Sequence, residues 1–280
     1  MTTIGVDIGG TKMLLLAHDA KGQPVRERRV GTGPAATPEY LSRQIHEFAR
    51  TLPGPPQAVG IAVPGLVDPA AGRVEISDVL PELAGWQPAE LLGTGIPHVL
   101  VNDIRAALVH TSRDLPADAT AATLVAGTAI GMGWMANGKV VHGVRGWAGE
   151  IGSTPVPTPR GVRRLDELAG GAAVVAATGL TPAAIHAALA ATDPAVTAAV
   201  RAAGASFGLA IATVVNLLNP LAITLAGGTL TYPGYLDSAL RTAEQTALPQ
   251  LWQSCTIRRA DDAPRIVALG AIHLAGQAIT

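Results

Sequence analysis

The segment VDIGGTK near the N-terminus places a carboxylate, two glycines and a hydroxyl where an apolar run meets a turn. Glycines allow backbone N–H groups to approach phosphate oxygens, and a threonine hydroxyl adds a further donor. A carboxylate beside bound phosphates is a natural anchor for Mg²⁺, often through a water molecule. This pattern predicts a site for a polyphosphate and Mg²⁺, formed by Asp7, Gly9, Gly10, Thr11 and Lys12. The same residues are equally compatible with a tight hairpin turn whose glycines adopt positive φ.

A similar pattern recurs in the segment AATLVAGTAIGMGWMANGKVVHG, residues 121–143. It again predicts a strand, a Gly-Thr turn at Gly127 and Thr128, a glycine-bearing strand, a tight polar turn and a strand. Two halves that begin alike favour two lobes facing each other across a cleft, with both turns gripping one polyphosphate. The sequence contains neither GxxxxGK[ST] nor GxGxxG, so a P-loop and a Rossmann fingerprint are excluded.

Apolar patterning elsewhere predicts strands that alternate with helices. Three segments alternate as strands do, at residues 3–8, 12–18 and 24–30. The segment PEYLSRQIHEFARTL has apolar residues at helical spacing. Further strands are expected in AVGIAVPG and HVLVND, and a helix opens near Ile104. The alternation favours an α/β fold.

Composition limits the classes of function. The 280 residues carry a formal net charge of −1, which gives no electrostatic basis for binding nucleic acid or an anionic membrane surface. Cys255 is the only cysteine, which excludes an internal disulfide and a thiolate metal cluster within one chain. Because the N-terminus also has no signal-peptide pattern, we expect a cytoplasmic protein.

One segment, AAGASFGLAIATVVNLLN at residues 202–219, is apolar enough to raise the question of a membrane helix. It contains serine, threonine and asparagine and stops at Pro220, which favours a helix buried in protein. Asp193 before Pro194 is typical of an N-cap followed by a first-turn proline. Gly204 and Gly208, one turn apart, predict close packing against another backbone.

Several segments, in this order, resemble the motifs of the ROK sugar kinases, bacterial members of the actin-like ATPase superfamily. DIGGTK is similar to their first phosphate motif, and GIAVPGLVDPAAGRV to their substrate-side pattern G-x-x-x-P-G-x-V-D-x-x-x-G. VNDIRAAL resembles the catalytic segment N-D-A-N-A-A. AGTAIGMGWMANGKVVHGVRGWAGEIGSTPV resembles the second phosphate motif running into A-G-E-I-G-H, and NPLAITLAGGTL the adenosine-side strand and Gly-Gly turn. The resemblance covers nearly the whole chain and implies a two-lobed actin-like ATPase (ribonuclease H-like) α/β fold with a central cleft between the lobes.

The resemblance also implies roles in binding the acceptor. Asp103 matches the general base that accepts the proton of the attacking sugar hydroxyl, although aspartate at this place is also a common N-cap. Asn102 and Glu150 match residues that hydrogen-bond sugar hydroxyls. Gly65 would leave room for the sugar near the backbone, and Asp78 lies near a position where the family often has an asparagine for the sugar.

For the donor, the resemblance implies ATP with Mg²⁺. Asp7 would hold the metal through water. The turn residues would meet the β and γ phosphates, and the Gly-Gly turn would lie against the adenosine: Gly9, Gly10, Thr11, Lys12, Gly127 and Thr128 on the phosphates, Gly227 and Gly228 on the adenosine.

The chain departs from the family where most members hold a structural zinc. The family's zinc-binding histidine is replaced by Ser153, and the three cysteine positions fall near Pro157, Pro159 and Arg164. Because tetrahedral zinc needs such ligands, the sequence predicts no structural zinc. The prolines of TPVPTPRG are expected to stiffen this loop instead.

Other departures concern the acceptor. Ser153 also removes an imidazole that touches the sugar in typical members, and Asp166 replaces a glutamate and is one methylene shorter. Arg105 replaces the second asparagine of N-D-A-N; we interpret it as an exposed helix residue, with a contact to phosphate or an acidic substituent as the alternative. Glucose is therefore only one of the acceptors that the sequence allows, beside an amino sugar or a cyclitol.

We therefore expect an ATP- and Mg²⁺-dependent kinase acting on a hydroxyl of a hexose or sugar-like acceptor, with Asp103 as general base. The alternatives are a polyphosphate-dependent glucokinase, because some actinobacterial relatives without the zinc motif use that donor, and a non-catalytic sugar-binding or regulatory protein. The family's repressors carry a winged helix-turn-helix before the core, whereas this chain begins with the first strand. The first lobe is expected at 1–104 with a C-terminal helix at 266–280, and the second at 105–265. The family resemblance implies a homodimer.

Overall fold

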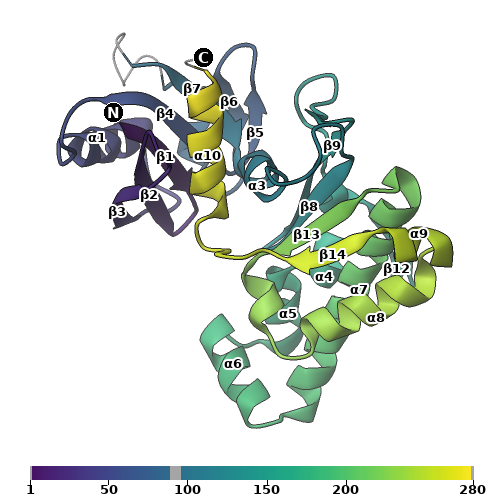
Figure 1. Cartoon of the computed structure of the whole chain (residues 1–280). Coiled ribbons are helices and arrows are strands. Elements are labelled where there is room, and N and C mark those ends of the chain that lie inside the picture. The colour runs from purple at the N-terminus through teal and green to yellow at the C-terminus, as the bar shows by residue number, and fades with distance from the viewer. Residues whose placement is uncertain (1, 89–95, 279–280) are drawn as a thin grey trace. The chain divides into compact units, whose positions relative to one another are not determined.

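The computed structural model describes residues 2–88 and 96–278, and these form two compact units (Figure 1). Unit 1 comprises Met1–Asp114, His142–Ala148 and Asp261–Thr280, and unit 2 comprises Leu115–Val141 and Gly149–Ala260. Two features differ from the division expected from the sequence. Unit 1 continues beyond residue 104 because helix α3 (Asp103–Thr111) packs against α10 (Ile266–Gln277). Unit 1 also includes the loop His142–Ala148, which the sequence prediction had assigned to the second lobe.

Unit 1 is built on a five-stranded sheet in the order β3-β2-β1-β4-β7. The first three strands are antiparallel, and β1, β4 and β7 are parallel. Their bounds are Thr2–Ile8 (β1), Lys12–Asp19 (β2), Pro24–Gly31 (β3), Pro56–Val63 (β4) and His98–Asn102 (β7). A small hairpin of β5 (Leu66–Asp68) and β6 (Arg73–Ile76) follows β4, and a 3-10 helix covers Pro81–Leu83.

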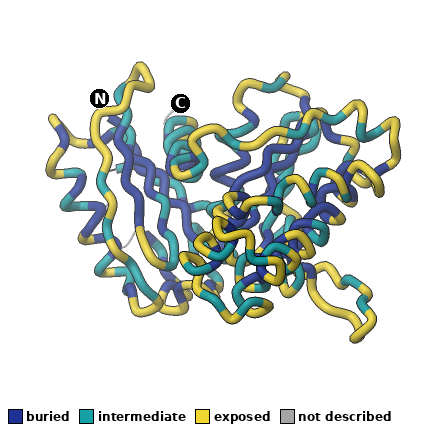
Figure 2. Tube along the Cα trace, turned by 90° about the horizontal axis from the view of Figure 1, so that it is seen from below, coloured by how far each residue is buried: buried dark blue, intermediate teal, exposed yellow. Residues whose placement is uncertain are grey.

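Helices cover both faces of this sheet, which explains the continuous apolar run of β2. Met13 and Leu15 belong to the core beneath α1 (Pro38–Ala49), whereas Leu14 and Leu16 pack with Ala268 of α10. Successive side chains of a strand point to opposite faces, so both sets are apolar. Figure 2 shows the central strands buried, in dark blue.

Unit 2 repeats the same topology with a second five-stranded sheet in the order β10-β9-β8-β13-β14. Its first three strands are antiparallel, and β8, β13 and β14 are parallel. The strands are Ala121–Ala126 (β8), Ile130–Ala136 (β9), Lys139–Val140 (β10), Ala222–Ala226 (β13) and Thr256–Arg259 (β14). The internal repeat read from the sequence is confirmed, and β8 and β9 are joined by the Gly-Thr turn that corresponds to the turn between β1 and β2.

Helices pack on the second sheet around α7 (Pro194–Leu218), which begins after the N-cap Asp193 as expected. The others are α4 (Asp166–Ala169), α5 (Gly171–Thr178), α6 (Pro182–Ala190), α8 (Tyr235–Thr246) and α9 (Pro249–Ser254). Gly204 and Gly208 face the backbone of α8 so closely that a Cβ at either would overlap a carbonyl oxygen. This is the close helix packing that their spacing predicted.

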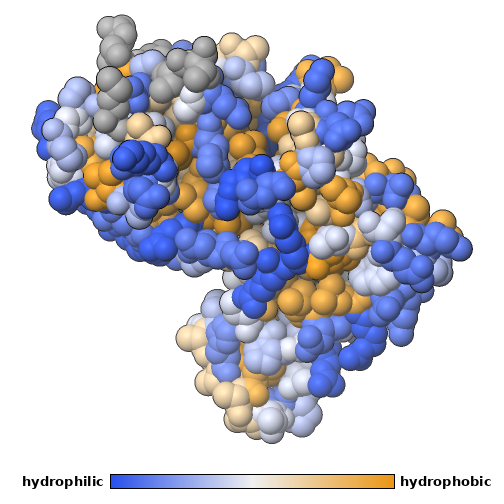
Figure 3. Space-filling model, viewed as in Figure 1, coloured by the Kyte–Doolittle hydropathy of each residue, from blue (hydrophilic) through white to orange (hydrophobic). Residues whose placement is uncertain are grey.

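Helix α7 is, within residues 2–88 and 96–278, the one helix whose length and composition alone would allow it to cross a membrane. In the structure 56% of its most apolar window is buried within the protein, which fits the core helix expected from its polar residues. Figure 3 shows hydrophilic residues over much of the face in view, with apolar groups between them.

The segment that resembles the zinc loop forms a hairpin of β11 (Pro155–Thr158) and β12 (Gly161–Arg164). Pro157 pairs with Val162, and Pro155 with Arg164. The Thr158 hydroxyl donates to the Gly161 carbonyl at 2.6 Å and closes the turn. Backbone pairing and a local hydroxyl bond thus order this loop, and none of the four family ligand positions carries a metal-binding side chain.

Candidate active site

The turn between β1 and β2 carries the first predicted phosphate-binding residues. The Gly9 N–H donates to the Lys12 carbonyl at 2.9 Å, and the Thr32 hydroxyl donates to the Gly9 carbonyl at 2.6 Å. Neither Gly9 nor Gly10 has a positive φ, so the hypothesis that these glycines are needed for a turn with positive φ is wrong. At Gly10 a Cβ would instead overlap the Val79 side chain. Gly10 therefore maintains space beside the turn, and Thr11 and Lys12 are exposed there.

Asp7 lies near the end of β1, beside Leu14 and Ala62 of the neighbouring strands. Burial first, and then the charge of the Asp103 carboxylate, raise the pKa of Asp7 to about 7, although Lys12 opposes the shift. Two carboxylates that repel each other next to an open glycine turn favour a cation between protein and phosphate. Within the described part of the chain, no three histidine, cysteine, aspartate or glutamate side chains could hold a metal ion by themselves. The residues therefore fit Mg²⁺ bound through one or two carboxylates, water and phosphate, which is its usual mode.

Asn102, at the end of β7, is the N-cap of α3. Its Oδ1 accepts from the N–H groups of Ile104 at 3.0 Å and Arg105 at 3.3 Å. Asp103 is the first helical residue, and its Oδ1 also accepts from the Ile104 N–H at 2.9 Å. The interpretation of Asp103 as the N-cap is therefore wrong by one residue. Its carboxylate stands at the N-terminus of α3 without being the cap.

Gly65 connects this cap to the substrate-side segment. Its carbonyl accepts from Asn102 Nδ2 at 2.9 Å, its φ is +127°, and a Cβ there would overlap the Ile76 carbonyl. The structure thus gives Gly65 a conformational reason that is independent of any ligand. Ser77 also lies against Gly65, and Val79, two residues later, reaches the phosphate turn at Gly10. Asp78 is exposed and stands between Ser77 and Val79 in the sequence.

Arg105 departs from its sequence interpretation. It is buried, with 6% of its surface exposed, and its Nη2 donates to the Gly146 carbonyl. The prediction that Arg105 is an exposed helix residue is therefore wrong. The acceptor belongs to the loop His142–Ala148, far away in sequence, which explains why no local pattern could indicate the contact.

Unit 2 holds the second phosphate turn. The Gly127 carbonyl accepts from the Gly171 N–H and from the Thr229 hydroxyl, both at 2.8 Å. The Thr128 carbonyl accepts from the Ala172 N–H at 3.1 Å. The turn is thus fastened to the first residues of α5, where backbone N–H groups gather. Gly171 and Thr229 were not predicted as site residues. The local signals were the two LAGG segments, of which one ends at Gly171 and the other directly precedes Thr229.

Gly227 and Gly228 follow β13, the parallel neighbour of β8, so they lie at the same sheet edge as the turn of Gly127. Gly227 has a φ of +108°, and a Cβ there would overlap the Ala126 carbonyl. Around Gly228 there is no atom within 4 Å of a hypothetical Cβ. The first glycine is required by the backbone, and the second borders open space.

The predicted acceptor residues of unit 2 lie around Gly152. A Cβ on Gly152 would overlap both Asp166 Oδ1 and the Ile130 carbonyl, so the segment of Glu150 and Ser153 packs tightly against α4. Asp166 Oδ1 accepts from the Ile130 N–H at 2.6 Å. Glu150 and Ser153 are exposed at the two ends of this contact. One oxygen of Asp166 is therefore engaged in fixing the strand that follows the phosphate turn.

The sequence profile of the ROK family matches residues 3–278. The chain belongs to the ROK family. An N-acetylmannosamine kinase of Escherichia coli O157:H7 is 33% identical over 158 residues, which are 55% of this chain and 54% of that relative. The chain thus spans about half the length of the curated relatives it matches.

Solved ROK structures share the fold of this chain. A ROK hexokinase from Thermus thermophilus aligns with a TM-score of 0.82 and 26% identity, covering 100% of this chain and 99% of its own. A ROK family glucokinase from Streptomyces griseus, in complex with glucose and AMPPNP, aligns with a TM-score of 0.82 and 23% identity, covering 99% and 100%. The predicted α/β fold of the actin-like ATPases is confirmed.

Proposed function

We propose that this ROK protein is a kinase that transfers a phosphoryl group from ATP, with Mg²⁺, to a hydroxyl of a hexose or sugar-like acceptor. The observation that carries the proposal is the pairing of Asp7 and Asp103 beside the glycine turn, with Asn102 rather than Asp103 capping α3. A second carboxylate near a phosphate site has no evident use in a module that only binds sugar. The relatives named N-acetylmannosamine kinase and hexokinase support the same class of reaction.

Asp103 acts as the general base in this proposal. As the acceptor oxygen bonds to the γ-phosphorus, the O–H bond breaks and its proton passes to the Asp103 carboxylate, while the terminal phosphoryl group leaves ADP. In unit 1 the backbone N–H groups of the glycine turn and the Thr11 hydroxyl would bind and orient phosphate oxygens, and in unit 2 the turn of Gly127 and Thr128 offers the same kinds of group. Mg²⁺, when bound, supplies neutralisation of the phosphate charge, and Asp7 is the residue that would hold it.

The acceptor would be held by the remaining candidates. The carboxylates of Asp78 and Glu150 and the Ser153 hydroxyl are suited to ring hydroxyls, and Asp166 would use Oδ2 because Oδ1 binds the Ile130 N–H. Gly65 and Asn102 would place the acceptor against Asp103. Ser153 and the short Asp166 make the site roomier than in typical members, so an amino sugar or a cyclitol is as suitable an acceptor as glucose.

The test measures donor consumption with Mg²⁺ against hexoses, amino sugars including N-acetylmannosamine, and cyclitols. Asp103→Asn is compared with Asp261→Asn, an exposed aspartate outside the candidate site. We expect one acceptor to be turned over, kcat to fall at least about 100-fold in Asp103→Asn, and Asp261→Asn to match the native chain. Turnover with polyphosphate but not ATP would identify the alternative donor. Sugar binding without turnover on either donor would contradict the kinase and favour a binding or regulatory protein.

We further propose that the protein acts in the cytoplasm, where ATP is available, and as a homodimer, as the family resemblance implies. Multi-angle light scattering of the purified chain tests the second point. A mass equal to twice the 28.4 kDa of the chain is expected, and a mass of one chain at all concentrations contradicts it.

A further inference from the structure

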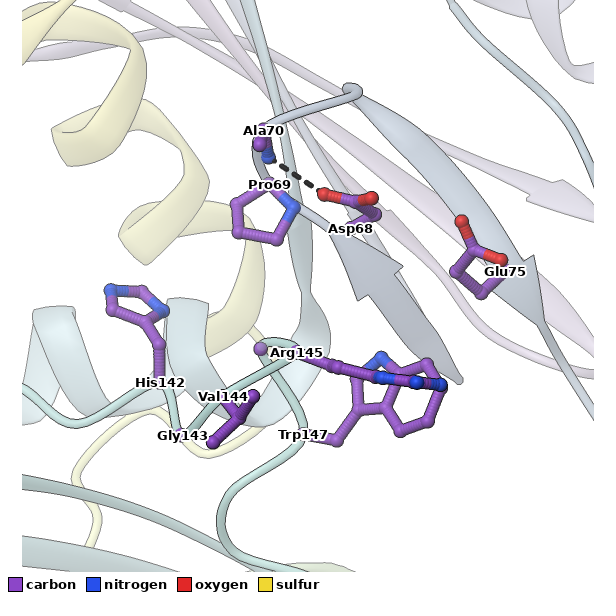
Figure 4. A pocket seen from close by; sticks show the side chains of 10 residues that line it. Asp68, Pro69, Ala70, Glu75, His142, Gly143, Val144, Arg145 and Trp147 are labelled. Carbon is purple, nitrogen blue, oxygen red and sulfur yellow. Dashed lines mark hydrogen bonds between the residues drawn. The ribbon is translucent and has the colours of Figure 1, made fainter.

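Unit 1 contains a pocket, and its lining includes none of the residues discussed above as acceptor ligands. Its volume is about 500 Å³, and it lies between the β5–β6 hairpin and the loop His142–Ala148. Figure 4 shows Asp68 and Glu75 of the hairpin on one side and His142, Arg145 and Trp147 of the loop on the other. All of these residues belong to unit 1, so the pocket is a property of that unit alone.

The hairpin joins this pocket to the candidate acceptor site. Gly65 directly precedes β5, and Asp68 ends it, so Asp68 lies about 10 Å farther along the strand at about 3.3 Å per residue. On the partner strand Ile76 pairs with Leu66, and Arg73 pairs with Asp68. One end of the hairpin therefore contacts the segment of Asp78, and the other end borders the pocket.

A second connection runs through α3. Arg105, two residues after Asp103, donates to the Gly146 carbonyl in the wall of the pocket. Gly146 has a φ of +81°, and a Cβ there would lie 3.0 Å from both the Val67 carbonyl and Pro69. The loop is thus held by the helix that carries the proposed base and by the hairpin that leaves Gly65.

The pocket offers balanced charge and both kinds of hydrogen-bonding group. Glu75 is paired with Arg73, and the Arg145 guanidinium lies 5.7 Å from the centre of the Trp147 ring. Asp68 Oδ1 accepts from the N–H groups of Ala70 and Ala71, and Oδ2 is the second acceptor of this carboxylate in the lining of the pocket. Two carboxylates and two guanidiniums therefore compensate one another, and a neutral ligand fits better than an ion.

His142 and Trp147 add groups suited to hydroxyls. Partial burial and the nearby charge of Arg105 lower the pKa of His142, so its imidazole is neutral near pH 7 and can both donate and accept. The Trp147 indole N–H is buried without a hydrogen-bond partner among the residues that the structure describes. An aromatic ring together with convergent acceptors and donors is a combination suited to a polyhydroxylated ring.

We propose that this pocket is a second sugar subsite, which holds the ring linked through a glycosidic bond to the ring that is phosphorylated. The acceptor of the enzyme is then a disaccharide or another glycoside rather than a free monosaccharide. This inference rests on the proposed kinase function, because it extends the acceptor site of that reaction.

The test compares maltose, cellobiose and chitobiose with glucose and glucosamine, both as kinase acceptors and in titrations of tryptophan fluorescence without ATP. We expect at least one disaccharide to change the fluorescence, and Trp147→Phe to remove that change. Asp68→Asn and Glu75→Gln should each raise the disaccharide KM roughly 10-fold, as expected for the loss of a hydrogen bond to a charged group, and leave monosaccharide constants unchanged. Asparagine keeps the oxygen that holds the Asp68 turn, and Glu244→Gln on α8 is the exposed control.

The outcomes separate this proposal from the kinase itself. Monosaccharide turnover with no disaccharide bound or used better than its monosaccharide would overturn the subsite and leave the kinase intact. Disaccharide binding that depends on Asp68 and Trp147, without turnover of any acceptor, would support the pocket and contradict the kinase. A disaccharide preference that is the same in the native chain and in Asp68→Asn and Glu75→Gln would also overturn the subsite.

Discussion

Asn102 binds the Gly65 carbonyl through Nδ2 at 2.9 Å while its Oδ1 caps the helix that begins at Asp103. One side chain thereby joins the end of β7, the start of α3 and the loop after β4. Serine at this position would keep a cap but cannot reach Gly65. We expect Asn102→Ser to lower the unfolding free energy by about 0.5–1.5 kcal/mol and to raise the acceptor KM roughly 10-fold, because the Gly65 loop loses its hydrogen bond to Nδ2.

Asn102→Ala is the matched variant, because it removes the cap as well. It should lower the unfolding free energy by about 1 kcal/mol relative to Asn102→Ser. Denaturant titration measures the first quantity and steady-state kinetics the second. Equal stability losses in both variants would show that the Gly65 contact, and not the cap, stabilises this region.

The interaction of Arg105 with Gly146 predicts a change in the accessibility of the loop His142–Ala148. Arg105→Met would leave the Gly146 carbonyl without this donor, at a cost of about 1.5–3 kcal/mol for a bond from a charged group. Local opening should then become roughly 10- to 100-fold more frequent, and trypsin should cleave faster after Arg145, which is exposed in that loop. Mass spectrometry identifies the cut.

Arg105→Lys should show an intermediate rate, because an ammonium can donate to one carbonyl but lacks the planar fork. Arg241→Met on the exposed surface of α8 is the control and should leave cleavage after Arg145 unchanged. If Arg105→Met is cut no faster than the native chain, the loop is held by its packing on Pro69 alone.

Several of these relationships lay beyond sequence reasoning for identifiable physical reasons. Asparagine and aspartate are both good caps, so ND before a helix does not determine which of the two is the cap. Arg105 looks like an exposed helix residue until a loop some forty residues later folds back to accept its hydrogen bond. By contrast, the strands around Asp7 and the N-cap Asp193 were predicted correctly, because alternation and capping are local properties.

The glycines illustrate the same limit. A sequence shows that Gly9, Gly10, Gly65 and Gly227 are glycines but not which need positive φ, and only Gly65 and Gly227 do. The binding roles assigned through the family resemblance stay predictions, since the structure places these residues without their ligands.

The stacked rings of His110 and His273 predict a pH-dependent stability of unit 1. Their centroids are 5.4 Å apart, and His110 Nδ1 lies 3.3 Å from His273 Nε2 between α3 and α10. Burial first, and then the charges of Arg113 and His273, lower the pKa of His110 to about 4. Burial, Arg113 and His18 also lower the pKa of His273, and Asp114 opposes both shifts. The folded state therefore binds fewer protons than the unfolded state between about pH 4 and 6.5.

Protonation of these two histidines in the unfolded state lowers the unfolding free energy as the pH falls, because the folded state does not take up the same protons. We expect this histidine pair to lower the unfolding free energy as the pH drops from 7 toward 4, by less than about 1.4 kcal/mol for each unit by which a pKa is lowered, because solvent screens the partly exposed rings. The raised pKa of Asp7 acts in the opposite direction, so the effect of the pair is the difference between the native chain and a histidine variant. Unfolding followed at a series of pH values tests this, and the stability of the native chain relative to His110→Gln, and to Arg113→Gln, is expected to decrease as the pH drops from 7 toward 4. Curves parallel to the native one would contradict the assignment of the effect to this pair.

Gly227 and Gly228 form a natural pair of variants for separating fold from nucleotide binding. Alanine at position 227 would be strained at a φ of +108° and would overlap the Ala126 carbonyl, so Gly227→Ala should lose about 1–3 kcal/mol of stability. Alanine at 228 meets no atom within 4 Å, and Gly228→Ala should stay within about 0.5 kcal/mol of the native chain. If adenosine lies against this turn, the added methyl of Gly228→Ala should raise the ATP KM several-fold without changing the acceptor KM. Measured ATP constants that equal those of the native chain, in a variant of native stability, would place the adenosine elsewhere on unit 2.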